Sequence, residues 1–137
     1  MTSAEPASPI QIWVAYNDAS NRGDHERAAR YIAPDLAVLI NGEPGVVSAE
    51  EDRAIQSELI RCYPDYTRLF LGGLDSGDRA AVEWRMQGTP GGEADLPPLD
   101  VPGCSLIRCV DGRMVEARIY HPTGALDRIA SRALGHD

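Results

Sequence analysis

Three segments have the marks of helices, and in the first of them apolar positions recur every three to four residues, the spacing that places them on one side of a helix. In the first segment, Ile10, Trp13 and Val14 share a stripe with Asn17, and Tyr16 lies beside it. A capping-box pattern, serine followed three residues later by glutamate, opens the third segment. Prolines follow the second and third segments and end them. We therefore predict helices over residues 10–21, 25–32 and 48–62.

Five other segments have the short apolar runs, bounded by turn residues, that are typical of β-strands. The first lies between the second and third helices, and a loop over residues 42–45 follows it. The other four come after the third helix. Asp-Ser-Gly-Asp and Asp-Gly turns join two pairs of them as hairpins. The predicted strands are residues 35–41, 66–74, 79–89, 101–110 and 113–121, and a last short helix begins near residue 123.

This order of elements predicts an α+β fold, in which a curved antiparallel sheet forms a cone and three helices pack on its concave face. Three helices fill such a face only partly, so we expect a pocket there. The other face of the sheet also needs cover, which dimerisation usually provides. With 137 residues the chain is long enough for one domain. We place it at residues 10–134, behind a flexible tail of residues 1–9.

The last predicted strand has two unlike faces, because successive side chains of a strand alternate. One face is apolar and ends in an imidazole: Val115, Ala117, Ile119 and His121. The other face carries Met114, Glu116, Arg118 and Tyr120. An ionisable group at the end of an apolar stripe suits a small catalytic pocket, and it also suits a hydrogen-bonded structural histidine.

Composition and charge exclude several classes of chemistry. The net charge is −8 with the acids spread along the chain, which argues against nucleic acid as a partner. All 13 basic residues are arginine, so neither a Schiff base nor covalently bound pyridoxal phosphate can form on lysine. The three cysteines lack C-x-x-C spacing and the three histidines are scattered. We therefore expect no metal and no cofactor.

Neither a membrane segment nor a secretory signal is expected. No apolar run is long enough to span a bilayer, and the first nine residues contain an acid and no apolar core. We therefore expect a cytoplasmic protein without a membrane partner.

One tyrosine and four short motifs follow one another along the chain. Tyr16 comes first, followed by Asn-Arg-Gly-Asp at 21–24 and Tyr-Ile-Ala-Pro-Asp at 31–35. Gly-Thr-Pro-Gly-Gly-Glu at 88–93 comes next, and Arg108 precedes Asp-Gly-Arg-Met-Val-Glu at 111–116. In this order they resemble the nuclear transport factor 2-like superfamily, and within it the SnoaL-like polyketide cyclase group. The resemblance implies a cone-shaped α+β barrel, usually a homodimer, with a deep apolar pocket. It also implies cofactor-free isomerisation, cyclisation, dehydration or epoxide opening, although some members only bind ligands.

The chain departs from that family at the positions that matter for catalysis. The resemblance places a carboxylate near the end of the last strand, where this chain reads Tyr-His-Pro at residues 120–122. The histidine that can accompany the carboxylate is replaced by Ser105. Tyr16 matches the first-helix tyrosine of ketosteroid isomerases, but their general-base position falls at Ile40 or Asn41.

The remaining candidates for catalysis are His121 and Tyr16. An imidazole can act as a general base near neutral pH, and a tyrosine can donate a hydrogen bond to a developing oxyanion. Each can also be purely structural. Asn41 could orient a substrate carbonyl or serve only in a turn. The candidate substrate-binding residues, with Trp84 placed inward, are Asn41, Trp84, Met86, Ser105 and Ile119.

The leading prediction is a cofactor-independent acid/base enzyme of secondary metabolism, a cyclase, isomerase or dehydratase. Its partner would be a small, apolar, polyketide-, terpenoid- or steroid-like substrate. One alternative is a non-catalytic small-molecule-binding or dimerisation module, which the missing carboxylate favours. Another is an epoxide or lactone hydrolase with a water held by Arg85 and Gln87. A shared cavity for His121 and Tyr16 would favour the enzyme.

Overall fold

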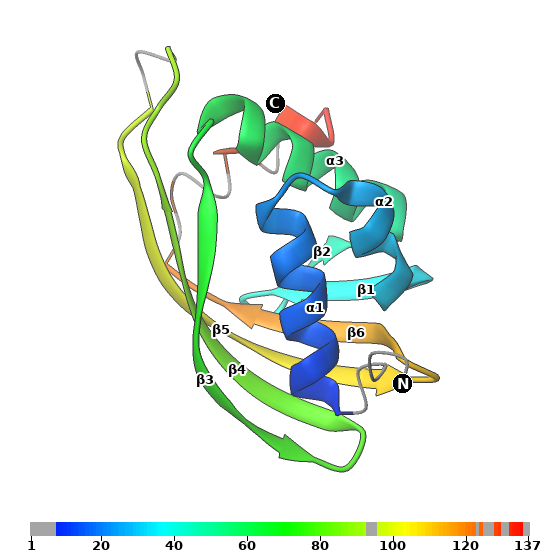
Figure 1. Ribbon diagram of the computed structural model, residues 1–137. Helices are drawn as coiled ribbons and strands as arrows, with labels where there is room; N and C mark the ends of the chain where they lie inside the picture. Colours follow the sequence, from blue (N-terminus) through cyan, green and yellow to red (C-terminus); the bar gives the residue numbers. More distant parts are fainter. Residues whose placement is uncertain (1–7, 93–95, 123, 125–127, 130–131, 136–137) are drawn as a thin grey trace, which may run out of the picture.

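The computed structural model describes residues 8–92, 96–122, 124, 128–129 and 132–135, and Figure 1 shows its three α-helices on one side of a curved sheet. The helices are α1 (Pro9–Asn21), α2 (His25–Ala28) and α3 (Ala49–Cys62). Side chains of Ser8, Asp24 and Ser48 cap their first turns by accepting backbone N–H bonds. The second helix is shorter than predicted, since a 3₁₀ turn (Ala29–Tyr31) leads directly into the first strand. The predicted last helix falls mostly on residues outside those described.

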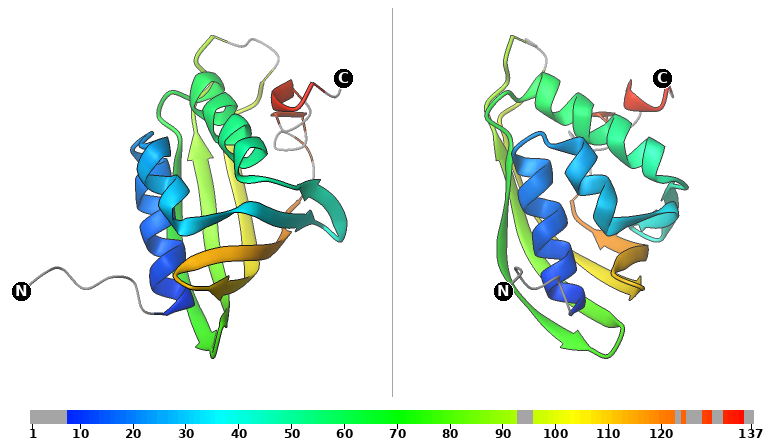
Figure 2. Two further views of the ribbon diagram at one scale, coloured as in Figure 1. Left: turned by 90° about the vertical axis from the view of Figure 1, so that its right-hand side faces the viewer. Right: turned by 45° about the vertical axis from the view of Figure 1, so that its right-hand side comes forward.

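Six strands form one sheet in the order β2-β1-β6-β5-β4-β3. Figure 2 shows the sheet bent around α1, with α3 crossing one end of the concave side. The fold is the predicted α+β cone with helices on the concave face. The strands are β1 (Ile32–Ile40), β2 (Glu43–Val46), β3 (Thr67–Ser76), β4 (Arg79–Gly88), β5 (Leu99–Val110) and β6 (Arg113–Tyr120).

Two features of the sheet differ from the prediction. First, β1 pairs parallel with β6, so the sheet is mixed and not wholly antiparallel. Second, the segment predicted as a loop forms β2 and pairs antiparallel with β1. Asn41 and Gly42 have φ values of 51° and 86°, and positive φ at both central positions is what a two-residue hairpin turn requires. The turn brings Glu43 opposite Ile40.

A β-bulge in β6 rearranges the two faces predicted for the last strand. Arg108 of β5 pairs with Glu116, but the next residue, Cys109, pairs with Met114. Val115 is therefore the extra residue of a bulge, which reverses the alternation of faces at this point. As a result Met114 is buried at 3% exposure, whereas Val115 is only half-buried. Ala117, Ile119 and His121 keep the predicted side.

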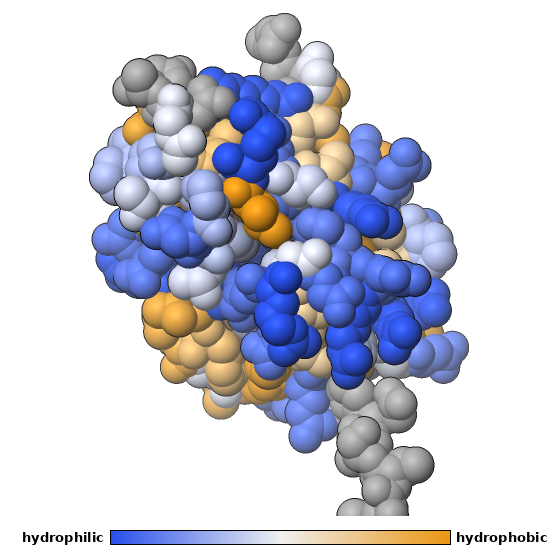
Figure 3. Space-filling view, turned by 45° about the horizontal axis from the view of Figure 1, so that its top comes forward, coloured by the Kyte–Doolittle hydropathy of each residue, from blue (hydrophilic) through white to orange (hydrophobic). Residues whose placement is uncertain are grey.

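Exposed apolar side chains concentrate on the sheet. On the edge strand β3, Leu69, Phe70, Leu71 and Leu74 are 40–77% exposed. Figure 3 shows hydrophobic side chains gathered on the sheet side of the molecule, at the left of that view, while hydrophilic side chains cover much of the rest. Among the described residues, no helix is both long and apolar enough to cross a membrane.

Candidate active site

The helices and the concave face of the sheet enclose an apolar cavity of about 100 Å³. For scale, an engineered apolar cavity of about 150 Å³ binds benzene. Fifteen of the lining side chains are apolar, and all of them except Ile129 come from α1, α3 and the strands. The polar lining is confined to six residues: Tyr16, Asp52, Gln56, Arg68, Ser105 and His121. An apolar cavity with a few converging polar groups is the usual form of a small-molecule site.

A tyrosine and a carboxylate from different helices are joined at the cavity. The hydroxyl of Tyr16 in α1 donates a hydrogen bond to Oδ2 of Asp52 in the first turn of α3. Burial, assisted by the negative charge of Asp52, raises the pKa of Tyr16 well above its usual value. Burial also raises the pKa of Asp52, although the Tyr16 hydrogen bond and the Arg68 charge oppose that shift. Tyr16 therefore keeps its proton, and Asp52 accepts one more readily than a surface aspartate.

Arg68 of β3 is buried, with 5% of its surface exposed. Its Nε donates to Oδ1 of Asn17 at 2.7 Å, and the Asn17 and Asn21 amides both donate to the Arg68 carbonyl, at 2.8 and 3.0 Å. Two asparagines of α1 thus hold both the backbone and the guanidinium. The guanidinium carbon lies 4.8 Å from the ring centre of Trp13, a cation–π distance.

Trp84 of β4 points into the cavity and is 1% exposed. Its indole N–H donates to Oγ of Ser105 at 2.9 Å, so the buried Ser105 hydroxyl holds the ring in place. Gly103 faces the ring from the neighbouring strand, where a side chain would collide with it. Met86 and Ile119, two other candidates for substrate binding, also line the cavity.

His121, directly after β6, lines the same cavity as Tyr16. Its Nδ1 lies 2.6 Å from the carbonyl oxygen of Pro122. Because a carbonyl only accepts hydrogen bonds, this contact places a proton on Nδ1 and leaves Nε2 as the ring nitrogen that can exchange a proton with a ligand. Asn41 lies elsewhere: it exchanges two hydrogen bonds with the His121 backbone, at 2.9 and 3.1 Å, and is not among the lining residues. Its place is structural, since it holds the end of β6.

Sequence reasoning missed three polar residues of the cavity, Asp52, Gln56 and Arg68. A carboxylate reaches the cavity from α3 and not from the last strand, and the spacing of Asp52, Gln56 and Leu59 along one helical face was the available signal. Asp52 otherwise looks like an ordinary acid in the first turn of a helix. Arg68 carries no comparable signal, because its neighbours in space belong to α1.

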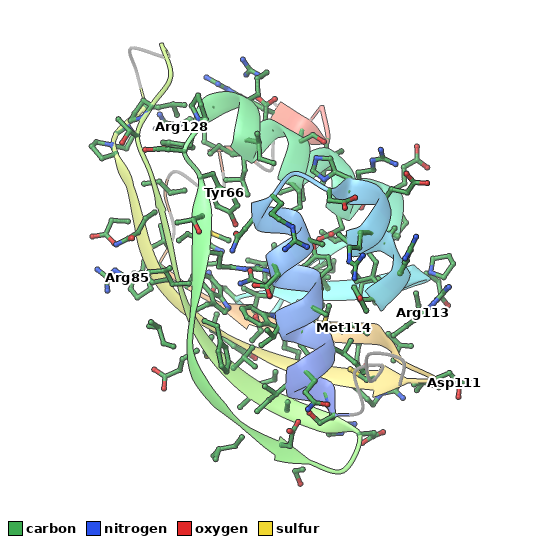
Figure 4. The ribbon with its side chains drawn as sticks, in the orientation of Figure 1. Tyr66, Arg85, Asp111, Arg113, Met114 and Arg128 are labelled. Atoms are coloured by element: carbon green, nitrogen blue, oxygen red, sulfur yellow. The ribbon has the colours of Figure 1, made fainter. Side chains whose placement is uncertain are left out.

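The water site expected for a hydrolase is not part of this cavity. Arg85 lies on the outer side of the sheet, pointing away from the helices (Figure 4), and its Nε donates to Asp100 at 2.6 Å. Neither Arg85 nor Gln87 is among the lining residues. Within the described part of the chain, no group of three or more His, Cys, Asp or Glu residues is arranged to hold a metal.

Solved structures with similar folds include three that cover nearly the whole chain. Wild-type IdmH from Streptomyces antibioticus, described as a proposed polyketide cyclase, is 23% identical with a TM-score of 0.75, over 94% of this chain and 99% of its own. A proposed SnoaL-like polyketide cyclase from Jannaschia sp. CCS1 is 18% identical with a TM-score of 0.70, over 96% of each chain. A protein with a ketosteroid isomerase-like fold from Catenulispora acidiphila is 15% identical with a TM-score of 0.70, over 91% and 95%. At these identities the likeness shows the fold alone.

The sequence itself identifies the family. None of the curated proteins compared with the chain matches it. The family model of the SnoaL-like domain, by contrast, matches residues 13–117, which run from α1 into β6 and include most of the cavity. The chain therefore belongs to the SnoaL-like domain family.

Proposed function

We propose that this protein is a cofactor-independent acid/base enzyme that cyclises, isomerises or dehydrates an apolar organic substrate. The observation that carries the proposal is the presence of a tyrosine-bound carboxylate and an imidazole, Asp52 and His121, in the lining of one apolar cavity. Each of these reactions removes a proton at one substrate atom and returns a proton at another. Two proton-carrying groups in one water-poor site suit that requirement.

Asp52 is the better placed of the two to remove the proton. Burial raises its pKa, which strengthens it as a base. Tyr16 orients the carboxylate by holding Oδ2. His121 in its protonated form then donates a proton from Nε2 at the other substrate atom, since its Nδ1–H is engaged by Pro122. The proton on Asp52 afterwards passes to the imidazole, which restores both groups. The opposite assignment, with His121 as the base and Tyr16 as the oxyanion donor, is the alternative that mutation distinguishes.

The apolar lining supports a substrate of polyketide, terpenoid or steroid type. The name of the Streptomyces antibioticus neighbour, a proposed polyketide cyclase, is in keeping with such a substrate and with a role in secondary metabolism.

The proposal is tested with 3-cyclohexenone, a single-ring ketone that becomes conjugated when a proton leaves C2 and another is added at C4. The absorbance of 2-cyclohexenone reports the rate. We expect the wild type to exceed the buffer rate, and Asp52→Asn to lower turnover by about 10²- to 10⁴-fold. Asp100→Asn makes the same chemical change on the outer face and should leave turnover unchanged. His121→Ala should also lose activity.

Three results decide between the assignments. Retained activity in Asp52→Asn with loss in His121→Ala makes His121 the base. Retained activity in both variants refutes the site. A wild type that binds the ketone without isomerising it refutes the enzyme and leaves the binding module.

We also propose that two copies associate through the outer face of the sheet. Leu69, Leu106 and Tyr120 are exposed on strands whose register places them on the side opposite Trp84. The same face carries the Arg108–Glu116 ion pair at 3.1 Å, so it offers both charge signs to a second copy. Light scattering after gel filtration tests this: a dimer that Leu106→Glu converts to a monomer supports it, and a monomeric wild type refutes it.

A further inference from the structure

A second cavity, of about 200 Å³, meets the apolar cavity at the Tyr16–Asp52 pair. Tyr16 and Asp52 line both cavities, together with Ile32 and Gln56. The rest of the second cavity is formed by α1, α2, the 3₁₀ turn and the first turns of α3. Asp52 therefore faces two spaces, and the proposed function uses only one of them.

The second cavity is polar and open to solvent. Seven of the eleven described residues that line it have polar or charged side chains. One water molecule needs only about 10–15 Å³ and two to four polar partners, so this cavity has room and partners for several. Glu50 and Arg53 line it and are exposed, which opens it to the surrounding solvent. Asp52 is only partly buried, and water in the cavity can therefore reach it.

His25, at the start of α2, lies between this cavity and the solvent. It lines the cavity and is only partly buried. Its Nε2 lies 3.5 Å from the Ser57 hydroxyl oxygen, so the ring reaches toward α3, the helix that carries Asp52. Burial raises the pKa of Asp52, and the positive charge of His25 is close enough to oppose that shift. An imidazole takes up and releases protons near neutral pH, which suits it to carry a proton between the cavity and the solvent.

We infer that the second cavity is the proton exit of the site: water in it carries the proton that Asp52 has taken from the substrate to His25, which releases that proton to the solvent. This inference rests on the proposed function, since it concerns the recovery of the same carboxylate. His121 is also only partly buried, and it takes up its proton from the same solvent. The transfer from Asp52 to His121 therefore does not cross the first cavity, whose apolar walls offer a chain of water molecules few partners.

Two cavities at one carboxylate meet two conflicting needs. Removing a proton from an apolar substrate is favoured where water is excluded. Recovering the carboxylate needs water, because the proton has to leave before the next substrate is bound. In the recovery step the O–H bond of the Asp52 carboxyl group breaks, and an N–H bond forms on His25 and breaks again as the proton enters the solvent. The first cavity can thus stay free of water while the second restores Asp52.

The hydroxyl proton of Tyr16 reports which cavity connects the pair with solvent, because Tyr16 donates it to Asp52. In deuterium oxide this proton is replaced by deuterium only when solvent reaches the pair. ¹³C NMR of protein labelled at the tyrosine Cζ atoms follows the replacement without any turnover. We expect the exchange rate of Tyr16 to stay the same when benzamide, a neutral single-ring compound, fills the first cavity.

Two variants change the second cavity and leave the first intact. His25→Gln keeps a polar side chain but removes the proton carrier, and it should slow the exchange by about 10²-fold, the lower end of what a positioned acid or base contributes. Ala49→Leu places a larger side chain in the lining of the second cavity and should slow the exchange at least as much. Ala54→Leu makes the same change in the same helix, outside the lining of both cavities, and should leave the rate unchanged.

Exchange that benzamide blocks, or an unchanged rate in His25→Gln, would overturn the inference. If Ala49→Leu does not fold, a crystal of the wild type decides: water in the second cavity at hydrogen-bond distance from Asp52 supports the inference, and a dry cavity overturns it. The result is independent of turnover. Exchange through the second cavity in a protein that does not isomerise 3-cyclohexenone sinks the proposed function alone, and isomerisation with exchange through the first cavity sinks this inference alone.

Discussion

Replacing Gly103 by alanine tests whether the fixed position of Trp84 shapes the cavity. Gly103 of β5 pairs with Trp84 of β4, and the indole lies flat against the glycine. A Cβ at residue 103 would lie 2.5 Å from Cζ2 and 2.7 Å from Cζ3 of the ring. These distances are about 1 Å below the usual contact distance of carbon atoms, so the indole must move.

The expected loss of stability follows from three contributions. Overpacking in a filled core costs about 1–3 kcal/mol. Moving the indole also weakens its 2.9 Å hydrogen bond to Ser105, which is worth about 1 kcal/mol. Alanine loses less backbone entropy than glycine on folding, which returns about 0.5–1 kcal/mol. The free energy of unfolding should therefore fall by about 1–3 kcal/mol.

Urea unfolding and calorimetric titration measure the two consequences. Gly103→Ala should lower the free energy of unfolding and weaken benzamide binding, because the displaced ring enters the cavity. The double variant Trp84→Leu/Gly103→Ala is the control. A leucine leaves room above residue 103, so the double variant should lose less stability than the sum of the two single variants. Gly103→Ala within 0.5 kcal/mol of wild type, or strictly additive losses, would refute the reasoning.

Three further predictions concern the polar residues of the cavity. Burial raises the pKa of Asp52 in the folded protein, so wild type loses stability as the pH rises through that pKa. Asp52→Asn does not ionise and should melt at a higher temperature than wild type at pH 7, with a difference that shrinks as the pH falls toward about 4; calorimetry showing a constant difference would contradict this. The Tyr16 hydrogen bond lowers the pKa of Asp52, so Tyr16→Phe should raise that pKa further. A ¹³C NMR titration of the Asp52 carboxyl group measures it, and a lower titration midpoint in Tyr16→Phe than in wild type would contradict the prediction. Asn17→Ala removes the acceptor of the buried Arg68 Nε and should cost about 2–4 kcal/mol in urea unfolding, more than Asn21→Ala, which affects only backbone contacts.

Much of the fold could be predicted because its signals are local. Capping residues and helical periodicity located the helices, and turn residues located the hairpins β3–β4 and β5–β6. The strand β2 was missed, since Pro44 and Gly45 favour a loop unless a neighbouring strand recruits them. The parallel pairing of β1 with β6 was missed for a similar reason: it joins segments about 80 residues apart, and no local pattern encodes it.

In the candidate site, too, local sequence patterns predict some residues and miss those whose role depends on contacts with distant segments. Alternation along β4 allowed either face to line the cavity; the favoured one had Trp84 inward, and the structure has it there. The face predicted for Met114 was wrong, because the order of apolar and polar positions does not reveal a one-residue bulge. Asp52 was missed because an aspartate in the first turn of a helix has the same local sequence whether it meets water or Tyr16. What it contacts is decided by the packing of α3 against α1 and the sheet.

The parallel neighbour of β1 bears on when the chain can fold during its synthesis. Before β6 exists, β1 has only the four-residue β2 as a partner, and a two-stranded ribbon is at best marginally stable alone. The residues up to α3, Tyr16 and Asp52 among them, would therefore leave the ribosome without a sheet to fold against. Contacts between such distant segments close late and slowly. The growing chain would leave one edge of β1 unpaired until Arg113–Tyr120 has emerged, and an unpaired strand edge is prone to aggregation in a partly folded chain.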